Sequence, residues 1–400
     1  MTRRRSIWAS LKSLTILCLL LLIGRSGLAT DSLFFSTLSS RDGLPSNIIS
    51  AVAQDSYGFI WIGTANGLAR YDGYQFTVFK KEVIAALPNN KVSSLLIDGD
   101  TLWVGTWKGL CKINVRSFEI STVDLGKNMV VRTLYKDRKG AVWIGTATGL
   151  IRYENRVITE YNTNNSNISH NMIRILHEDQ VGNLWVGTYD KLNRLSALDN
   201  QFRQYDLKGN YKPSLKNNLI MDIKAASDST IWVGTETGLV LFNTSSGAYA
   251  HFSEKSAGFS NEVIKCIYSD EGGRLWLGTD FGLNVFNPAT GSAFSEFHNP
   301  QIPYSIANNV VWQIMEDTGG VIWLATSNGL SRINKHRKYY EFVEVSHEVN
   351  GKKVGNQVKA ALVAENGAQW LGTLYGVIRV DAVTGKKEIF NTQSDPARRI

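Results

Sequence analysis

The segment WIGTANGL, from Trp61 to Leu68, returns seven more times along this 400-residue chain. The tryptophans that open the eight copies are Trp61, Trp103, Trp143, Trp185, Trp232, Trp276, Trp323 and Trp370. Successive tryptophans stand 42, 40, 42, 47, 44, 47 and 47 residues apart. A period of this length is typical of one supersecondary unit repeated in an array, and four-stranded propeller blades fall within it.

The residues beside each tryptophan are aliphatic, as with Ile60 and Ile62, and Gln369 is the one polar exception. A strand that is apolar at consecutive positions is covered on both faces, which is the environment of a blade packed between two others. The glycine after the tryptophan, as at Gly63, allows a neighbouring backbone to come close. The second glycine, as at Gly67, suits a turn with positive φ. Burial of an indole contributes at most about 5 kcal/mol, so packing accounts for this column better than ligand binding.

The rest of each repeat predicts three more strands. Apolar residues twelve and nine positions before the tryptophan, such as Ile49 and Val52, indicate a first strand. A turn from Asp to Gly, such as DSYG from Asp55, then leads to the tryptophan strand, and Asp and Gly are the residues that a type I turn prefers at these places. With a single Asp in each turn and no DxDxDG run, turn geometry explains these acids better than calcium binding. Two further strands follow, as at Leu68 and Phe76.

The strand count predicts an all-β, seven-bladed β-propeller of four-stranded antiparallel blades, plus the first blade of a second propeller. Leu33 to Leu38 has the pattern of a fourth strand with no blade before it. Propellers close when such an N-terminal strand completes the last blade, which removes exposed sheet edges. We therefore expect a signal peptide at 1–29, the first propeller at 30–338 and an incomplete second one at 339–400, whose fourth-strand candidates include Tyr339 to Val345. One blade of a ring is not stable alone, so we expect a longer protein.

The first 29 residues have the pattern of a secretory signal: Arg3, Arg4, Arg5 and Lys12 precede the apolar run Leu14 to Ile23. Ten helical residues rise about 15 Å, which is half the hydrocarbon core of a membrane, so an uncleaved anchor is the weaker alternative. Five of the 43 basic residues lie in this segment, so the other 38 face 35 acidic residues. That near balance argues against nucleic-acid binding.

The chain has three cysteines, one of which, Cys18, lies in the leader. Cys111 and Cys266 occupy apolar strand positions four repeats apart. They are therefore expected to be buried free thiols and not a disulfide.

The run NIISAVAQDSYGFIWIGTANGLARYDGYQFTVF, Asn47 to Phe79, closely resembles the two-component regulator propeller repeat, as does the lead-in LSSRDGLPSN. The resemblance extends over nearly all of the chain after the leader. It implies the exported sensory part of a membrane signalling protein with two seven-bladed rings, a small immunoglobulin-like domain, a membrane span, and a cytoplasmic histidine kinase or diguanylate cyclase. None of those later parts occurs in this sequence. Lys191 in place of glycine, and the turns SDST and ENGA, depart from the family pattern in the fourth, fifth and eighth repeats.

A candidate ligand site follows from the repeat geometry, because the loop entering the first strand and the hairpin after the tryptophan strand lie on one face of a blade. Eleven residues before the tryptophan, or at the tips of these hairpins, stand Arg132, Arg174, Lys265, Trp312, Trp107, Tyr189 and Phe281. Cations beside exposed aromatic rings suit an acidic oligosaccharide or another anionic small ligand. Two alternatives remain open: arginines that are solvated or paired with acids, and tryptophans that mark a protein interface.

We therefore expect a periplasmic ligand-binding sensor, with the full-length protein in the inner membrane. The alternatives are an exported propeller enzyme acting on carbohydrate and a protein-interaction scaffold. The sequence offers no nucleophile elbow, HExxH motif or phosphate loop, and the histidines are scattered, so we expect no catalytic residue, metal or cofactor in this chain. A homodimer of the full-length protein is left open.

Overall fold

A computed structural model describes residues 33–207 and 219–334, and then 346–349, 352–355, 358–364, 368–373, 376–381 and 386–390. The chain divides into two compact units, Met1–His336 and Arg337–Ile400. The expected leader at 1–29 and the strand expected at Tyr339 to Val345 lie outside the described residues. The described part is an all-β propeller with eight four-stranded antiparallel sheets, which confirms the predicted fold class at this level.

Seven of the eight sheets lie in the first unit, and we number them in chain order, each from its innermost strand outward. Sheet 1 is β2 (Ile49–Gln54), β3 (Ile60–Thr64), β4 (Gly67–Tyr71) and β5 (Phe76–Phe79). Sheet 2 is β6 (Val92–Asp98), β7 (Thr101–Thr106), β8 (Gly109–Asn114) and β9 (Ile120–Val123). Sheet 3 is β10 (Val131–Lys136), β11 (Val142–Thr146), β12 (Leu150–Glu154) and β13 (Val157–Tyr161). Sheet 4 is β14 (Ile173–Glu178), β15 (Leu184–Thr188), β16 (Leu192–Leu195) and β17 (Phe202–Tyr205).

The remaining three sheets of the first unit follow the same order. Sheet 5 is β18 (Ile220–Ser227), β19 (Thr230–Thr235), β20 (Gly238–Asn243) and β21 (Tyr249–Phe252). Sheet 6 is β22 (Ile264–Ser269), β23 (Leu275–Thr279), β24 (Leu283–Asn287) and β25 (Ser292–Glu296). Sheet 7 is β26 (Val311–Glu316), β27 (Val321–Thr326), β28 (Gly329–Asn334) and β1 (Ser36–Leu38). A 3-10 turn, η1 (Ser40–Asp42), and one short helix, α2 (Glu254–Ala257), complete this unit as described.

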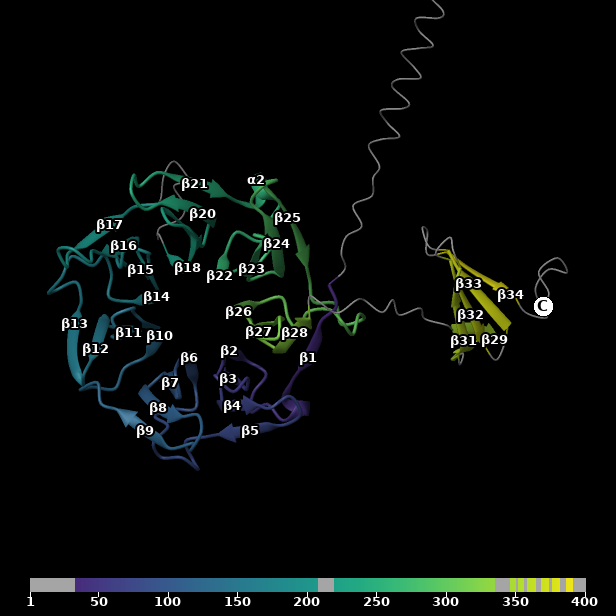
Figure 1. Cartoon of the computed structure of the whole chain (residues 1–400), viewed down its shortest axis with the longest axis horizontal. Helices are drawn as coiled ribbons and strands as arrows, with labels where there is room; N and C mark the ends of the chain where they lie inside the picture. Colours follow the sequence, from purple (N-terminus) through teal and green to yellow (C-terminus); the bar gives the residue numbers. More distant parts are fainter. Residues whose placement is uncertain are drawn as a thin grey trace, which may run out of the picture. The chain divides into compact units, whose positions relative to one another are not determined.

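The sheets of the first unit form a closed ring (Figure 1). Strand β1 pairs antiparallel with β28, with Ser36 opposite Arg332, as the sequence predicts for Leu33 to Leu38. On the inside of the same junction, Val52 N–H donates a 2.8 Å hydrogen bond to Gln313 Oε1. The two ends of the ring are thus held together at the inner and the outer strand.

The core of the first unit is divided into layers between neighbouring sheets, and each layer contains one tryptophan of the repeat. Trp61, for example, is fully buried with Leu102 and Val104 of sheet 2. The exposed fraction of these seven tryptophans is at most 6%. This confirms a packing role for the column in the first unit.

The conserved spacing of glycines has the expected geometric cause. A Cβ atom at Gly187 would lie 2.5 Å from Ile175 Cγ2 and 2.7 Å from Ile220 Cγ2 of the next sheet. Such contacts are shorter than carbon atoms tolerate, so only glycine lets the inner strands approach. Gly67 has a φ of +126°, which confirms the left-handed turn expected at the second glycine.

The Asp that opens the turn has a second role that the sequence analysis missed. In sheet 1, Asp55 Oδ1 accepts backbone hydrogen bonds from Tyr57 and Phe59, as turn chemistry predicts. Its other oxygen, Oδ2, accepts a 2.8 Å bond from Trp61 Nε1. The same indole bond, 2.8 to 3.1 Å long, joins Trp143 to Asp137, Trp185 to Asp179, Trp276 to Asp270 and Trp323 to Asp317. A buried indole N–H is costly if it has no acceptor, so this acid fixes the ring in its layer.

Cys111 and Cys266 are buried free thiols, as the sequence predicts. Burial raises the pKa of the Cys111 thiol to about 12 and also raises the pKa of Cys266. Neither thiol is therefore reactive at neutral pH.

The second unit contains the eighth sheet and one hairpin. The sheet is β31 (Val358–Val363), β32 (Gln369–Thr373), β33 (Gly376–Val380) and β34 (Lys387–Phe390), and the hairpin is β29 (Ser346–Val349) with β30 (Lys352–Gly355). Val358, Leu362 and Val363 of β31 are exposed, unlike the apolar residues of the inner strands in the first unit. The repeat pattern thus forms the same sheet here without the cover that the ring provides.

We predict that Asp55→Ala lowers the free energy of unfolding by about 3 kcal/mol, because it leaves two backbone N–H groups and a buried indole N–H without their acceptor. Chemical denaturation of the chain measures this change. Asp72→Ala is the matched control in the same sheet: Asp72 caps a turn through two backbone N–H groups but is exposed. An equal loss in both variants would contradict the role of the indole bond.

Candidate functional site

Every inner strand of the first unit carries a register shift near its start, eleven residues before the tryptophan of its sheet, or ten in sheet 2. A β-bulge of this kind leaves one residue unpaired and re-aims its side chain. The bulge residues in chain order are Ser50, Ser93, Arg132, Arg174, Met221, Lys265 and Trp312. Four of the seven residues proposed as a ligand site therefore occupy bulges, a backbone feature that the spacing alone did not show.

In sheets 1 and 2 the bulge residue is a serine that joins neighbouring sheets. Ser50 Oγ donates to the carbonyl oxygen of Val92, and Ser93 Oγ donates to that of Val131. In these two sheets the bulge side chain is therefore already hydrogen-bonded to the neighbouring sheet. Larger side chains take its place in the other five.

Arg132, Arg174 and Tyr189 come together at the start of the inner strands of sheets 3 and 4. The Arg132 Cζ atom lies 5.7 Å from the centroid of the Tyr189 ring. Its Nε atom is buried and, within the described part of the chain, has no hydrogen-bond partner. Burial and the charge of Arg132 lower the pKa of Arg174, whereas Tyr189 and Asp222 act in the opposite direction. His170 stacks on Tyr189, with the two ring centroids 6.0 Å apart.

This group, Arg132 with Arg174 and Tyr189, is called the arginine cluster below. Two like charges held side by side in a half-buried place are unfavourable unless an anion compensates them. An unused N–H donor in the same place makes the geometry suitable for a carboxylate or sulfate group.

Asp222, beside the bulge of β18, is a charged residue that the sequence analysis missed. Its Oδ1 accepts from Ile223 N–H at 2.8 Å, and its Oδ2 accepts from Ile267 N–H of sheet 6 at 2.7 Å. Part of the residue reaches solvent, but its carboxyl group lies deep in the molecule. Burial raises the pKa of this carboxyl group to about 6, although the two hydrogen bonds and the charges of Lys224 and Arg174 lower it. The available signal was its charge, because the residues ten positions before the other tryptophans of the first unit are uncharged.

Lys265 and Trp312 form a second group at sheets 6 and 7. The Lys265 Nζ atom lies 4.1 Å from the Trp312 ring centroid and 3.0 Å from Asp280 Oδ1. Asp280 therefore compensates the charge that the sequence analysis assigned to an anionic ligand, so this lysine is the weaker candidate. Phe281, next along the chain, is 53% exposed and packs against Phe297.

Trp107 belongs to a third group, on sheet 2. It is 46% exposed, and the Nζ atom of Lys91 lies 3.2 Å from the centroid of its ring. The seven residues proposed from the sequence thus fall into three groups of contacts. The arginine cluster is the one with two cations and an unused donor.

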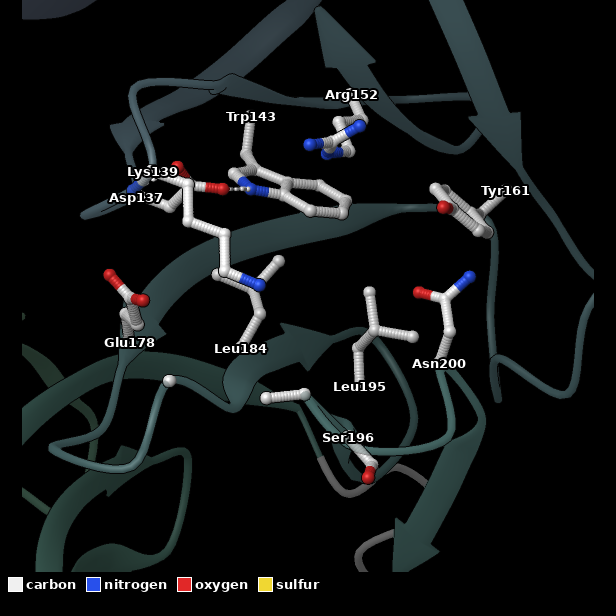
Figure 2. A pocket seen from close by; sticks show the side chains of 12 residues that line it. Asp137, Lys139, Trp143, Arg152, Tyr161, Glu178, Leu184, Leu195, Ser196 and Asn200 are labelled. Atoms are coloured by element: carbon white, nitrogen blue, oxygen red, sulfur yellow. Dashed lines mark hydrogen bonds between the residues drawn. The ribbon is translucent and has the colours of Figure 1, made fainter. Parts of the chain in front are cut away.

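A separate pocket of about 180 Å³ opens between sheets 3 and 4, at the far end of β10 from Arg132 (Figure 2). Its walls include the Trp143 indole, Tyr161 and Arg152 of sheet 3, with Leu184 and Leu195 of sheet 4 opposite. Lys139 and Glu178 lie on the side of Asp137, and Asn200 lies on the opposite side, near Tyr161 and Leu195. Nothing in the sequence analysis pointed to this pocket.

Within the residues that the structure describes, no group of three or more His, Cys, Asp or Glu side chains is arranged to hold a metal ion. The same residues include no helix long and apolar enough to cross a membrane.

The sequence matches a model of the two-component regulator propeller over residues 43–66, 86–108, 125–148, 167–190, 258–281 and 305–328. The match to the fourth repeat ends just before Lys191, and the repeats of Trp232 and Trp370 lie outside the matched segments. No curated protein matches the chain.

Among solved structures, the chain is similar to the extracellular domain of BT4673 from B. thetaiotaomicron, described as a hybrid two-component system, with 26% identity and a TM-score of 0.68. The match covers 91% of this chain and 48% of that one, so the chain spans about half the length of that relative. The extracellular domain of BT3049 from the same organism matches at 19% identity and a TM-score of 0.65, over 90% of this chain and 55% of its own. A virginiamycin B lyase from Staphylococcus aureus, at 15% identity and a TM-score of 0.57 over 76% of this chain and 99% of its own, shares the fold alone.

We predict that Asp222 makes the stability of the chain fall as the pH rises from about 4 to about 6. Its pKa is raised in the folded state above the ordinary 3.8, so the folded protein holds this proton over a range in which the unfolded chain has lost it. The stability advantage of wild type over Asp222→Asn should therefore be largest at pH 4 and smaller by on the order of 2 kcal/mol at pH 7. Urea unfolding of both proteins across this range measures the difference, and parallel pH profiles would contradict the assignment.

Proposed function

The chain is built from two-component regulator propeller repeats, and from this we infer that it is the extracellular ligand-binding part of a membrane signalling protein. Its likeness to the extracellular domain of BT4673 supports this role, because that likeness extends over 91% of the chain. We assign no catalytic step to the chain.

The observation that carries the ligand-binding proposal is the arginine cluster. Arg132 keeps a buried Nε donor unused, and Arg174 lies close enough for the two charges to oppose each other. An anionic group would relieve both costs at once, and the Tyr189 ring beside them offers a surface for a sugar ring. The ligand class that fits best is an acidic oligosaccharide.

The architecture that goes with this proposal is a seven-bladed propeller formed by sheets 1 to 7, followed by a second propeller that begins with sheet 8. The ring contacts of β2 with β26 and β27 support the first part. The exposed apolar residues of β31, which further blades would cover, and the twofold length of the related extracellular domain support the second.

In this proposal the module lies in the periplasm and acts through a membrane span on a cytoplasmic histidine kinase or diguanylate cyclase. A ligand can transmit a signal only if it binds one arrangement of the protein better than another. The proximity of the two arginine charges supplies such a difference, because a bound anion would offset it further than Asp222 does.

We predict that trigalacturonate raises the melting temperature of the chain saturably, whereas neutral cellotriose does not. Arg132→Met and Arg174→Met should each weaken the affinity at least about tenfold, because each removes hydrogen bonds to a charged group worth roughly 1.5 kcal/mol or more. Thermal shift and calorimetric titration measure these effects, and stronger salt should weaken the binding.

Arg203→Met is the matched control: it removes one arginine whose contact is an exposed ion pair with Asp199 in sheet 4. Its affinity should equal that of the wild type. Equal binding by the two cluster variants and this control would rule out the arginine cluster as the site.

A further inference from the structure

The pocket between sheets 3 and 4 lies where five of the other six layers of the ring place an aromatic side chain of the following sheet against the tryptophan. Among the described residues, five of the seven buried tryptophans make a ring contact, at 5.6 to 6.4 Å, with an aromatic residue of the following sheet. These partners are Phe118 for Trp61, Tyr153 for Trp103, Phe242 for Trp185, Phe286 for Trp232 and Tyr71 for Trp323. The following sheet thus usually completes the aromatic cover of the indole.

Trp143 is different. In the described part of the chain, its ring contact is with Tyr161 of its own sheet, at 5.9 Å. Sheet 4 contributes Leu184, Leu195 and Phe202 to this layer, and Phe202 contacts Tyr161 at 5.6 Å and not the indole. The pocket of about 180 Å³ is at this place (Figure 2). An engineered cavity of about 150 Å³ holds a benzene molecule, so the space is large enough for one six-membered ring.

Comparison with the layer between sheets 1 and 2 shows what is missing. Phe118 and Asn200 occupy the same position, fifteen residues after Trp103 and Trp185 respectively. Both have left-handed backbones, with φ of 58° and 55°. At the first place a phenyl ring lies over the tryptophan layer, and at the second a short amide lines the pocket.

The cation beside the tryptophan shows the same difference. Arg70 of sheet 1 has its Cζ atom 3.5 Å from the Phe59 ring centroid and 5.1 Å from that of Phe118. Arg152 is its counterpart in sheet 3, 5.9 Å from the Trp143 ring centroid, but Ala141 stands in place of Phe59 and Asn200 in place of Phe118. Arg152 instead pairs with Glu154 at 2.9 Å.

The charges at the pocket favour an anionic substituent on the ring. Asp137 accepts the indole N–H and two backbone N–H groups, and Glu178 accepts Arg138 N–H at 2.9 Å. Lys139, in contrast, has no ion pair among the residues that the structure describes, and its ammonium group extends over the opening (Figure 2). A carboxylate on the ring would therefore meet a free cation.

We propose that the pocket between sheets 3 and 4 is a binding site for a small aromatic acid, with its ring over Trp143 and its carboxylate at Lys139. This site is independent of the arginine cluster, which lies at the other end of β10. Cation–ring and ring–ring contacts supply the selectivity for an aromatic over an aliphatic ring.

The test uses the whole chain with isotope-labelled tryptophan indoles. Benzoate is titrated into it, and NMR follows the shift of each indole Nε1–H signal. In the wild type we expect the Trp143 signal to shift saturably. Asn200→Phe should abolish this shift, because its phenyl ring fills the pocket as Phe118 does in sheet 2. Phe118→Asn should produce a second shifted signal, that of Trp61, because it opens the equivalent space.

Three further titrations make the result specific. Cyclohexanecarboxylate, which has the charge without the aromatic ring, should bind more weakly than benzoate. Lys139→Gln should weaken benzoate but leave uncharged p-cresol unchanged. Asn200→Phe should keep or raise the melting temperature, since Phe118 shows that this backbone accepts a phenyl side chain.

Two outcomes would overturn the proposal. One is the absence of any saturable indole shift in both the wild type and Phe118→Asn. The other is an equal benzoate shift in the wild type and in a folded Asn200→Phe. Phe118→Asn is expected to gain a binding site, whereas Asn200→Phe is expected to lose one. A folding defect in one of the two variants therefore leaves the other as a test.

Discussion

The tryptophan held between two sheets is the constraint on which the rest of this structure depends. Each indole is in contact with apolar residues of two sheets, and its burial contributes up to about 5 kcal/mol before chain entropy is counted. Its N–H group must also find an acceptor, and the Asp of the preceding turn provides one in five of the described sheets. One residue therefore links the turn, the sheet and the packing of the next sheet in these five sheets. Sheet 2 forms without this bond, and there the buried Nε1 atom of Trp103 has no hydrogen-bond partner among the described residues.

This rigid frame concentrates variation at two places, the bulge of the inner strand and the tip of the second hairpin. The bulge residue has no partner in its own sheet, so its side chain is free to bridge sheets, as Ser50 does, or to carry a charge, as Arg132 does. The unfavourable proximity of Arg132 and Arg174 is tolerated because the closed ring holds both strands in place. A rigid scaffold that holds two like charges close together, at a cost in free energy, is pre-organised to bind an anion.

The two proposed sites arise in different ways. The arginine cluster uses positions that differ among the repeats, whereas the pocket beside Trp143 lies in a layer whose tryptophan, unlike five of the others, makes no ring contact with the following sheet among the described residues. The first is a feature of the inner strands, and the second lies at the opposite end of β10, where the Asp turns are. Because the repeats are so similar, comparison with the other layers shows which side chain normally fills the space beside the tryptophan.

The sequence by itself determined the repeat, the four strands of each sheet, the burial of the tryptophans and the closing strand, because these follow from residue spacing and from the period of apolar residues. It also placed Arg132, Arg174 and Tyr189 near one another, since all three lie at one end of their strands. Only the tertiary structure showed that Asp280 compensates Lys265, that Asp222 bonds to the backbone of sheet 6, and that Asn200 lines a pocket beside Trp143. Each of these depends on side chains that meet across two sheets or two loops, and a single sequence records how far apart residues are along the chain, not which of them touch across it.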